Sequence, residues 1–215
     1  DNFRKHLASE PPGWGYNPAK RTAKAVFSLK MTRDAAAEAC GQIGPKPGRA
    51  HNREVGGLIW DVARGRGQFM CIDLPPRLLN LRRDFQIKVD PQFFFIENGR
   101  PVIFYLQPRQ GRVPAVDGLR IIASAVHALF AEDEFSNAEL LLLDLSKPQG
   151  CKERAVASYG FRDLPPLPVE KLERFLQRFV DAYDLVSAEG VVRKARRARP
   201  PLDRGDDLFG GPASA

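Results

Sequence analysis

The stretch of sequence that decides the fold is Val89-Asp90-Pro91-Gln92-Phe93-Phe94-Phe95-Ile96-Glu97-Asn98-Gly99-Arg100-Pro101-Val102-Ile103-Phe104-Tyr105-Leu106-Gln107-Pro108-Arg109. Two runs of aromatic and β-branched residues flank Asn98-Gly99, and runs of this kind favour β-strands. Asn-Gly is the preferred dipeptide of the two-residue type I′ turn, which joins neighbouring antiparallel strands. The stretch therefore predicts a β-hairpin within residues 90–109, with Phe93 opposite Phe104.

The same register brings polar side chains together at the open end of the hairpin. Counting outward from the turn places Asp90 opposite Gln107, and Arg109 follows two residues later on the same face. Pro91 and Pro108 adjoin them, and because proline cannot donate a hydrogen bond to a strand ladder, the ladder is expected to fray there. This end of the hairpin is the first candidate for a functional site.

Helical and strand-like patterns surround the hairpin on both sides. Apolar residues at helical spacing predict helices at residues 32–40, 49–63, 116–131 and 169–188. Short alternating or continuous apolar runs predict strands at residues 24–31, 69–74, 84–89, 139–145 and 155–161. This order predicts an α/β fold, in which a central mixed sheet contains the hairpin of residues 90–109 and is flanked by helices.

The composition is that of a folded protein without a membrane span. The chain has 215 residues, of which 43% are hydrophobic and 27% charged, and this balance excludes wholesale disorder. No apolar run approaches the roughly 18 residues of a transmembrane helix, and residues 1–16 lack the apolar core of a signal peptide. The three cysteines are too few and too scattered for a disulfide framework. We therefore expect no membrane association and a cytoplasmic location, while what preceded Asp1 stays open.

Composition also divides the chain into three parts. Residues 1–23 are rich in proline and glycine and show no periodicity, so they predict an extended arm. Residues 24–190 are expected to form a single α/β domain. Residues 191–215 are basic and lack the apolar residues needed for packing, which predicts a disordered tail. The tail holds the candidate nucleic-acid contacts Arg193, Lys194, Arg196 and Arg197.

Charge is distributed unevenly along the chain. The formal net charge is +7, with an excess of basic residues before residue 113 and after residue 190. Residues 113–190 instead carry 13 acidic and 8 basic residues. This asymmetry favours a surface that faces a polyanion such as DNA, together with an acidic 113–190 region that offers a docking face to a protein partner.

The order of the elements resembles the core of the PD-(D/E)XK nuclease superfamily. In this resemblance Asp90 stands for the Asp of the family motif, Gln107 for its second carboxylate and Arg109 for its Lys. Glu54, on the predicted helix before the sheet, matches a glutamate that often adds a metal ligand in that family. The resemblance covers about residues 49–145 and implies a restriction-endonuclease-like core acting on DNA. It also implies Mg²⁺ as the cofactor, held by Asp90, Glu54 and Gln107.

Two departures from the family motif bear on activity. Gln107 offers a neutral oxygen where a hard divalent cation prefers a carboxylate. Arg109 is suited to bidentate phosphate binding but cannot accept a proton. The sequence therefore supports two functional hypotheses. The first is a Mg²⁺-dependent endonuclease with reduced or lost activity, and the second is a non-catalytic nucleic-acid-binding or protein-interaction subunit of a larger complex.

Other interpretations of the same residues stay open. Residues 24–63, interpreted as strand, helix and helix, look loosely like a ribbon-helix-helix DNA-binding unit. The polar hairpin end is also compatible with an ordinary strand start and exit. Glu54 is compatible with an exposed helix residue, and Asp144 with a cap on the turn after its strand. A folded domain without any role on nucleic acid is the third functional class.

Overall fold

The computed structural model of the chain describes residue 4 and residues 14–83, 85–111, 113–132 and 135–190. Contacts divide the chain into residues 12–182 and a smaller unit of residues 1–11 with residues 183–215. In the smaller unit Arg4 forms an ion pair with Glu189. The division falls inside the single domain that was predicted over residues 24–190, and the predicted tail lies outside the described residues.

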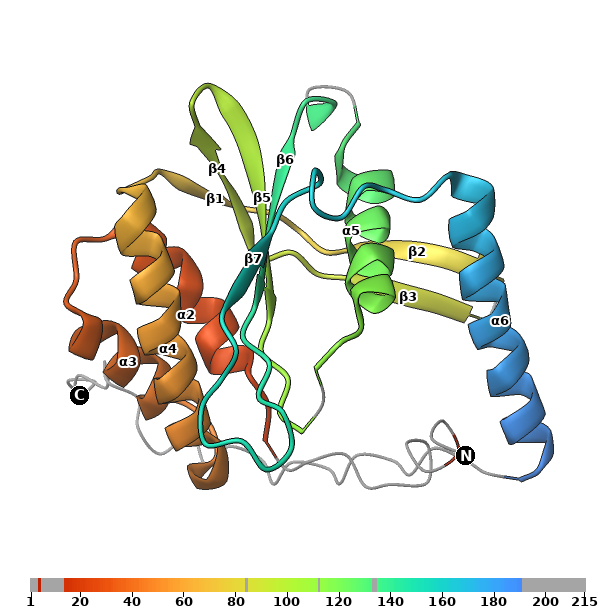
Figure 1. The fold of residues 1–215 in the computed structure, drawn as a ribbon, viewed down its shortest axis with the longest axis horizontal. Helices are drawn as coiled ribbons and strands as arrows, with labels where there is room; N and C mark the ends of the chain where they lie inside the picture. The colour runs from red at the N-terminus through yellow and green to blue at the C-terminus, as the bar shows by residue number, and fades with distance from the viewer. Residues whose placement is uncertain (1–3, 5–13, 84, 112, 133–134, 191–215) are drawn as a thin grey trace, which may run out of the picture. The chain divides into compact units, whose positions relative to one another are not determined.

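A five-stranded mixed sheet forms the centre of residues 12–182 (Figure 1). Its paired order is β1 (Cys71–Asp73), β4 (Phe93–Glu97), β5 (Arg100–Gln107), β6 (Glu139–Asp144) and β7 (Ala157–Tyr159). β5 and β6 run parallel, whereas the other neighbours are antiparallel. The helix α5 (Val116–Phe130) makes the crossover that a parallel pair requires. The α/β class and the central mixed sheet flanked by helices are thereby confirmed.

The hairpin has the predicted turn and register. Phe93 pairs with Phe104 across β4 and β5. Asn98 and Gly99 adopt φ angles of 51° and 75°, which are the positive values that a type I′ turn requires at both loop residues. Asn tolerates this left-handed conformation better than other residues with a side chain, and Gly adopts it without a steric penalty.

The hairpin ladder ends before it reaches Asp90, so the predicted pairing of Asp90 with Gln107 is wrong. The last pair on β4 is the one made by Phe93. Beyond this pair, the backbone N–H of Leu106 donates to the side-chain oxygen Oε1 of Gln92 at 2.7 Å. A side chain thus accepts a hydrogen bond that a backbone carbonyl would accept in a continued ladder. Asp90 instead directly follows a strand of a second sheet, and the intervening proline supplies no N–H to continue the first ladder.

Three helices cover one face of the five-stranded sheet (Figure 1). They are α2 (Asn17–Ser28), α3 (Arg33–Gln42) and α4 (Lys46–Arg66). The strand predicted at residues 24–31 is wrong, because α2 extends through Ser28 and buries apolar residues at helical spacing, namely Ala19, Ala23, Val26 and Phe27. The ribbon-helix-helix interpretation of residues 24–63 therefore fails, and the predicted arm is helical from Asn17 onward.

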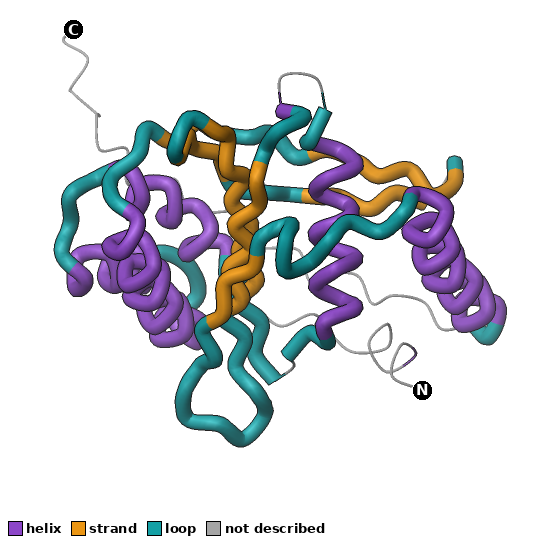
Figure 2. The backbone as a smooth tube through the Cα atoms, turned by 45° about the horizontal axis from the view of Figure 1, so that its top comes forward, coloured by secondary structure: helices purple, strands orange, loops and turns teal. Residues whose placement is uncertain are grey.

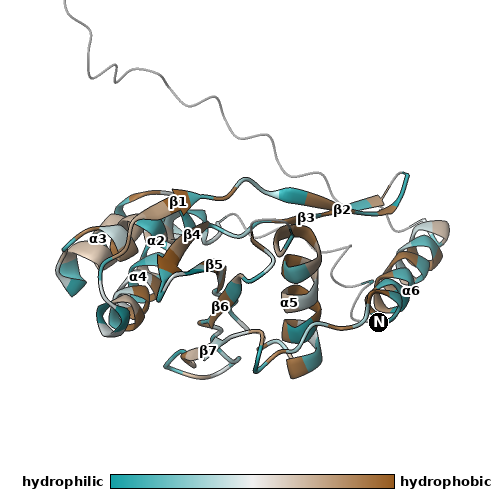
Figure 3. Ribbon diagram, turned by 90° about the horizontal axis from the view of Figure 1, so that it is seen from above, coloured by the Kyte–Doolittle hydropathy of each residue, from teal (hydrophilic) through white to brown (hydrophobic). Residues whose placement is uncertain are grey.

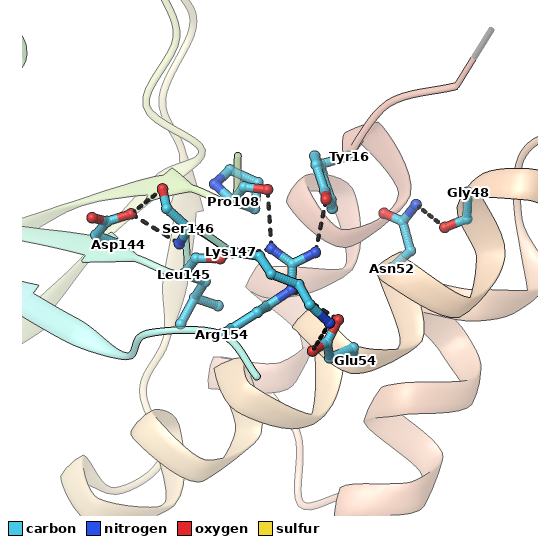
Figure 4. A network of polar contacts seen from close by, with 10 residues as sticks. All are labelled: Tyr16, Gly48, Asn52, Glu54, Pro108, Asp144, Leu145, Ser146, Lys147 and Arg154. Atoms are coloured by element: carbon cyan, nitrogen blue, oxygen red, sulfur yellow. Dashed lines mark hydrogen bonds and ion pairs between the residues drawn. The ribbon is translucent and has the colours of Figure 1, made fainter. Parts of the chain in front are cut away.

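Close packing of α3 against α4 fixes the position of the α4 side chains. A Cβ atom added at Gly56 would lie 2.7 Å from Cys40 Sγ and 2.8 Å from the Ala36 carbonyl oxygen. Only glycine allows the two helices to approach this closely. The glycine thus serves helix packing on the outer side of α4, and it leaves Glu54 directed toward the loops that follow the sheet (Figure 4).

Helices lie on both sides of the strands of the sheet (Figure 2), and the sheet separates two apolar cores. Side chains alternate between its faces, so Phe104 and Leu106 of β5 pack against the α2–α4 side, whereas Ile103 and Tyr105 pack on the α5 side. The first core is rich in aromatic contacts, and the stacked rings of Phe93 and Phe104 lie 4.7 Å apart. These cores hold the strand ends that carry the candidate site residues.

A separate two-stranded ribbon, β2 (Arg77–Arg82) with β3 (Phe85–Val89), extends past α5 toward α6 (Val169–Ala188) (Figure 3). The strand at β3 was predicted from residue 84 on, whereas β2 was not predicted. Apolar side chains of the ribbon, including Leu79 and Ile87, pack with residues of α5 and α6. Within the described part of the chain, no helix has the length and apolar character needed to cross a membrane.

Candidate functional site

A groove of about 570 Å³ opens between α2, the connection from β1 to β2, and the end of β3. Its lining comes from three separate segments of the chain: Asn17, Lys20, Arg21 and Lys24; residues 73–76; and Lys88 with residues 90–92. The helix α2 reaches the sheet edge here, where Lys24 Nζ pairs with Asp73 Oδ2 at 2.7 Å. The groove therefore exists only because the residues predicted as an arm and strand form a helix beside β1.

The groove is positively charged. Its lining includes four cations, Lys20, Arg21, Lys24 and Lys88, and two carboxylates, Asp73 and Asp90, which leaves a net charge of +2. Each carboxylate already has a lysine partner, since Lys24 pairs with Asp73 and Lys88 Nζ lies 3.4 Å from Asp90 Oδ2. Lys20 and Arg21 have no carboxylate within ion-pair distance among the described residues. These two cations are available to an anionic ligand.

Two of the residues predicted to form the site, Asp90 and Arg109, lie around Tyr105. Burial raises the pKa of the Tyr105 phenol, the nearby Arg109 cation lowers it, and the Asp90 carboxylate raises it. Lys20 contacts the same ring, with Nζ 5.7 Å from its centroid. Burial lowers the pKa of Lys20, Asp90 raises it, and the cations Lys88 and Arg109 lower it. Asp90, Arg109 and the groove cations therefore share one electrostatic environment.

Gln107 lies on β5 but does not present its side chain to solvent. The residue is 7% exposed and is paired with Asp144 of the parallel strand β6. Asp144 is buried and accepts hydrogen bonds from Ser146 N–H at 3.0 Å and Ser146 Oγ–H at 2.5 Å. Asp144 therefore caps the turn after its strand, as one interpretation of the sequence had it.

Glu54 belongs to a different cluster, on the α4 side of the sheet (Figure 4). Its Oε2 accepts a hydrogen bond from Arg154 Nε at 3.0 Å, and its Oε1 lies 3.3 Å from Lys147 Nζ. The two cations come from the segment after β6, so Glu54 ties α4 to that segment. Both carboxylate oxygens of Glu54 are thereby engaged by the protein itself.

Arg154 is the centre of this second cluster. Its side chain is 0% exposed, and besides Glu54 it donates to Tyr16 Oη at 2.7 Å, to the Leu145 carbonyl at 2.7 Å and to the Pro108 carbonyl at 3.3 Å. The planar guanidinium can satisfy several acceptors at fixed angles, which a lysine cannot do. Arg154 thus joins the segment before α2, the helix α4 and the ends of β5 and β6.

The surroundings of Arg154 are closed and aromatic. The rings of Trp14 and His51 stack at 4.7 Å, and Trp14 also packs edge-on against Tyr16. Burial raises the pKa of Tyr16, although the hydrogen bond and charge of Arg154 lower it. Burial lowers the pKa of His51, and Arg154 lowers it further. The cluster is therefore a structural joint, in which each charge already has a partner within the protein.

The residues predicted to bind Mg²⁺ do not fit that ion as they lie. Mg²⁺ requires several oxygen ligands in an octahedral shell. Both oxygens of Glu54 are held by Arg154 and Lys147, whereas Asp90 lies in the groove with Lys88. Across the residues that the structure describes, no three His, Cys, Asp or Glu side chains gather as a possible metal-binding group. No catalytic step through a metal is derived from this arrangement.

The sequence had identified Asp90 of the groove and the nearby Arg109, but it had missed the principal cations of the groove. Lys20 and Arg21 fell in the predicted arm, where no pattern marked them. Their helical context was signalled by Ala19, Ala23 and Val26, which recur at helical spacing. Arg154 had no such signal, because it stands in a polar loop and its partners are distant in sequence. The tail cations Arg193, Lys194, Arg196 and Arg197 lie outside the described residues.

Comparisons of the chain with protein-family models, with curated proteins and with solved structures found no match.

Proposed function

We propose that this protein binds DNA, and that the groove beside α2 holds the phosphate backbone. The observation that carries the proposal is the meeting of cations from two distant segments, residues 20–24 and Lys88, in the lining of one groove, with the Arg109 cation close enough to Lys20 to lower its pKa. Cations that neutralise phosphates release condensed counterions, which is the main source of affinity in sequence-independent DNA binding. A groove that gathers such cations and leaves some of them without partners suits this ligand.

The arginine and lysine side chains would contact phosphate groups in different ways. Arg21 and Arg109 each offer a planar fork of donors that matches two phosphate oxygens. Lys20 and Lys88, which line the groove from α2 and β3, act as point charges. The charge of Lys20 is disfavoured by partial burial, as the lowered pKa shows, and a bound phosphate would relieve that cost. Binding of a phosphate would therefore favour the charged form of Lys20.

The test is a salt titration of DNA binding with matched variants. Fluorescence anisotropy of a labelled duplex would compare the wild-type protein with the Lys20→Gln/Arg21→Gln variant. We expect the variant to bind about tenfold or more weakly at about 0.1 M salt, and its log–log salt slope to be shallower by about 1 for each phosphate that is no longer neutralised. The control is Lys171→Gln/Arg174→Gln, which removes the same charges from exposed positions on α6.

Two results would refute the proposal. One is unchanged affinity in the groove variant. The other is an equal loss of affinity in both variants, because that would show dependence on net charge alone and not on the groove.

Metal-dependent cleavage of DNA is the second candidate function. The observation that favours it is the chain order α4, β1, β2, β3, β4, β5, α5 and β6, with β5 and β6 parallel, which contains the helix, strands, hairpin, helix and strand on which the PD-(D/E)XK resemblance rests. Asp90 and Arg109, two of the motif positions, also share one environment. The engagement of Glu54 by Arg154 and the neutral side chain of Gln107 instead support a binding protein without cleavage.

Cleavage is tested by incubating labelled single-stranded, double-stranded and branched DNA with the protein in Mg²⁺, Mn²⁺ or EDTA. An endonuclease predicts metal-dependent cutting that disappears in Asp90→Ala. Binding without cutting, unchanged by EDTA, is the result expected from the groove. Cutting that persists in Asp90→Ala would exclude Asp90 from the chemistry. The predicted partner-binding role of residues 113–190 is a separate proposal, tested by whether a captured partner is released when salt is raised.

A further inference from the structure

The β2–β3 ribbon has one covered face and one open face. Antiparallel pairing sets Leu79 opposite Ile87, and this pair packs into the apolar cluster that includes residues of α5 and α6. The residues on either side of Leu79 and of Ile87 along each strand point to the opposite face, because side chains alternate along a strand. The open face therefore carries two cross-strand pairs, Leu78 with Lys88 and Asn80 with Gln86, all four of which are exposed.

The centre of the open face is a pair of amides in a defined arrangement. Gln86 Nε2 donates to Asn80 Oδ1 at 2.8 Å. This bond uses the oxygen of Asn80 and one donor of Gln86, and it leaves the amide nitrogen of Asn80 and the amide oxygen of Gln86 available. A donor and an acceptor thus stand side by side on adjacent strands. Adenine offers the complementary pair in the major groove, because its N7 accepts and its N6 amino group donates.

The dimensions of the ribbon suit the major groove of duplex DNA. Paired strands lie about 4.8 Å apart, and a six-residue strand such as β2 is about 20 Å long. The major groove is about 12 Å wide and admits a two-stranded ribbon. The exposed Leu78 beside Lys88 adds an apolar contact of the kind that a thymine methyl group accepts. The turn after β2 also carries the exposed Arg83.

The ribbon is continuous with the phosphate-binding groove. Lys88 belongs both to the open face of β3 and to the groove lining, and residues 74–76 lead directly from the groove into β2. A backbone strand held by Lys20 and Arg21 would therefore pass the base of the ribbon. The two surfaces together offer what a reader of duplex DNA requires, which is phosphate contacts for position and base-edge contacts for sequence.

We infer that the open face of the β2–β3 ribbon enters the major groove of double-stranded DNA and selects A·T base pairs through Asn80 and Gln86. The inference rests on the proposed DNA binding by the groove and adds sequence selectivity to it. Duplex RNA is excluded as the ligand of this face, because its deep and narrow major groove does not admit side chains.

Selection from a random duplex library tests the inference. The wild-type protein should enrich a short motif that contains adenine, and Asn80→Ala/Gln86→Ala should lose this enrichment. On the selected duplex the variant should bind about 5- to 150-fold more weakly, the loss expected for one bidentate base contact. On an unrelated duplex its affinity should stay within about twofold, because the groove cations are intact. The control Gln42→Ala/Gln177→Ala removes two exposed amides elsewhere.

A chemical substitution in the DNA identifies the groove that is read. Replacing the selected adenines by 7-deazaadenine removes the N7 acceptor and leaves Watson–Crick pairing intact. The wild-type protein should then bind the substituted duplex more weakly than the natural one, by a smaller factor than the amide variant loses, because the adenine N6 amino group can still donate to Gln86. Circular dichroism of each variant must match the wild-type spectrum, and if the double alanine variant fails to fold, the 7-deazaadenine duplex tests the same contact with wild-type protein.

The outcomes separate this inference from the proposed function. Binding to every duplex with equal affinity, and no effect of 7-deazaadenine, would overturn the ribbon inference and leave groove binding in place. Equal binding of duplex RNA would overturn it as well. Absence of any DNA binding would overturn both. If light scattering showed that the alanine variant loses self-association while its DNA binding is unchanged, the ribbon would be an interface between copies of the chain and the inference would fail.

Discussion

Two clusters of charged side chains lie on different elements of this protein and differ in how their charges are satisfied. In the cluster around Arg154, this arginine is buried whereas Glu54 and Lys147 are partly exposed, and Arg154 bonds to Glu54 and to carbonyl oxygens. The groove beside α2 is open, and Lys20 and Arg21 have no carboxylate partner in the described part of the chain. The polar groups of the first cluster are engaged within the fold, whereas two cations of the second have no carboxylate partner among the described residues.

This difference shows that the type of a residue does not by itself indicate its role. Glu54 is a carboxylate at the place where a metal-ligand glutamate is expected, yet Arg154 and Lys147 engage both of its oxygens. Burying ions is costly, and the cost is recovered only when the geometry is good and every group is paired. A fully paired buried ion therefore indicates structure. A surface that gathers like charges without partners indicates a ligand of the opposite charge.

Replacing Arg154 should have the largest effect on stability. Arg154→Met would leave Glu54 and Tyr16 without their strongest partner and would free two buried carbonyl oxygens. We expect a loss of about 3–5 kcal/mol in the free energy of unfolding, as is typical when one partner of a buried pair is removed. Chemical denaturation monitored by circular dichroism measures it. Arg53→Met, which removes an exposed ion pair with Glu38, should cost no more than about 1 kcal/mol.

The double variant Arg154→Met/Glu54→Met sharpens this result. Removing both charges eliminates the carboxylate that has lost its Arg154 partner, so part of the lost stability should return, although Lys147 then loses its own partner Glu54. A loss below about 1 kcal/mol in the single variant would show that the Arg154 cluster is not a structural joint. A double variant that is less stable than the sum of the two single variants would contradict the pairing of Arg154 with Glu54.

The pH dependence of stability should show an intermediate effect at high pH. Burial raises the pKa of Tyr16 and Tyr105 in the folded protein above the ordinary value of about 10. Between that value and the raised pKa, the folded state binds more protons than the unfolded state. The contribution of the two tyrosines to the free energy of unfolding is therefore fully present below about pH 10, and it is lost as the pH rises through their raised pKa values.

Ultraviolet difference spectroscopy at alkaline pH measures this effect directly. In the folded protein Tyr16 and Tyr105 should ionise above the ordinary tyrosine pKa of about 10. The assignment is checked with Tyr105→Phe, which should remove one of the late titrations. Absence of any ionisation above the ordinary value in the folded protein would contradict the burial of Tyr16 and Tyr105.

The smallest change in stability is expected in the groove. Lys20→Gln removes a cation whose charge is disfavoured by burial and by the neighbouring Lys88 and Arg109. We expect the free energy of unfolding to change by no more than about 0.5 kcal/mol in the destabilising direction, as for an ordinary surface substitution. The same variant should weaken DNA binding. A large loss of stability in Lys20→Gln would make the groove a structural cluster like that of Arg154.

Part of the fold could be predicted because local chemistry settles it. Asn98-Gly99 requires one turn type, and that turn fixes the register of Phe93 with Phe104. The run Leu140–Leu143 is too apolar and too short for anything but a buried strand, and it is β6. The boundaries of α6 at residues 169–188 follow from its apolar spacing in the same way.

Other elements could not be predicted from local pattern. Residues 24–28 alternate as in a strand, but Val26 and Phe27 also continue the helical spacing that begins at Ala19, and burial of that face against the sheet favours the helix. Asp90 follows a strand that leaves the sheet, so counting from the turn placed it wrongly beside Gln107. Pairing rules hold only as far as the ladder continues.

The amino-acid sequence by itself determined the hairpin, its register and the α/β class, because turn geometry and side-chain alternation act over a few residues. Only the tertiary structure decided which charges meet. Glu54 and Arg154 are 100 positions apart in the sequence and form a hydrogen bond in the fold. Lys20 is more than 80 positions away from Tyr105 and Arg109, yet it contacts the ring of Tyr105 and lies close enough to Arg109 for that cation to lower its pKa. Such contacts depend on how helices pack against the sheet, and no local pattern carries that information. The assignment of one charged cluster to structure and the other to a ligand therefore required the fold.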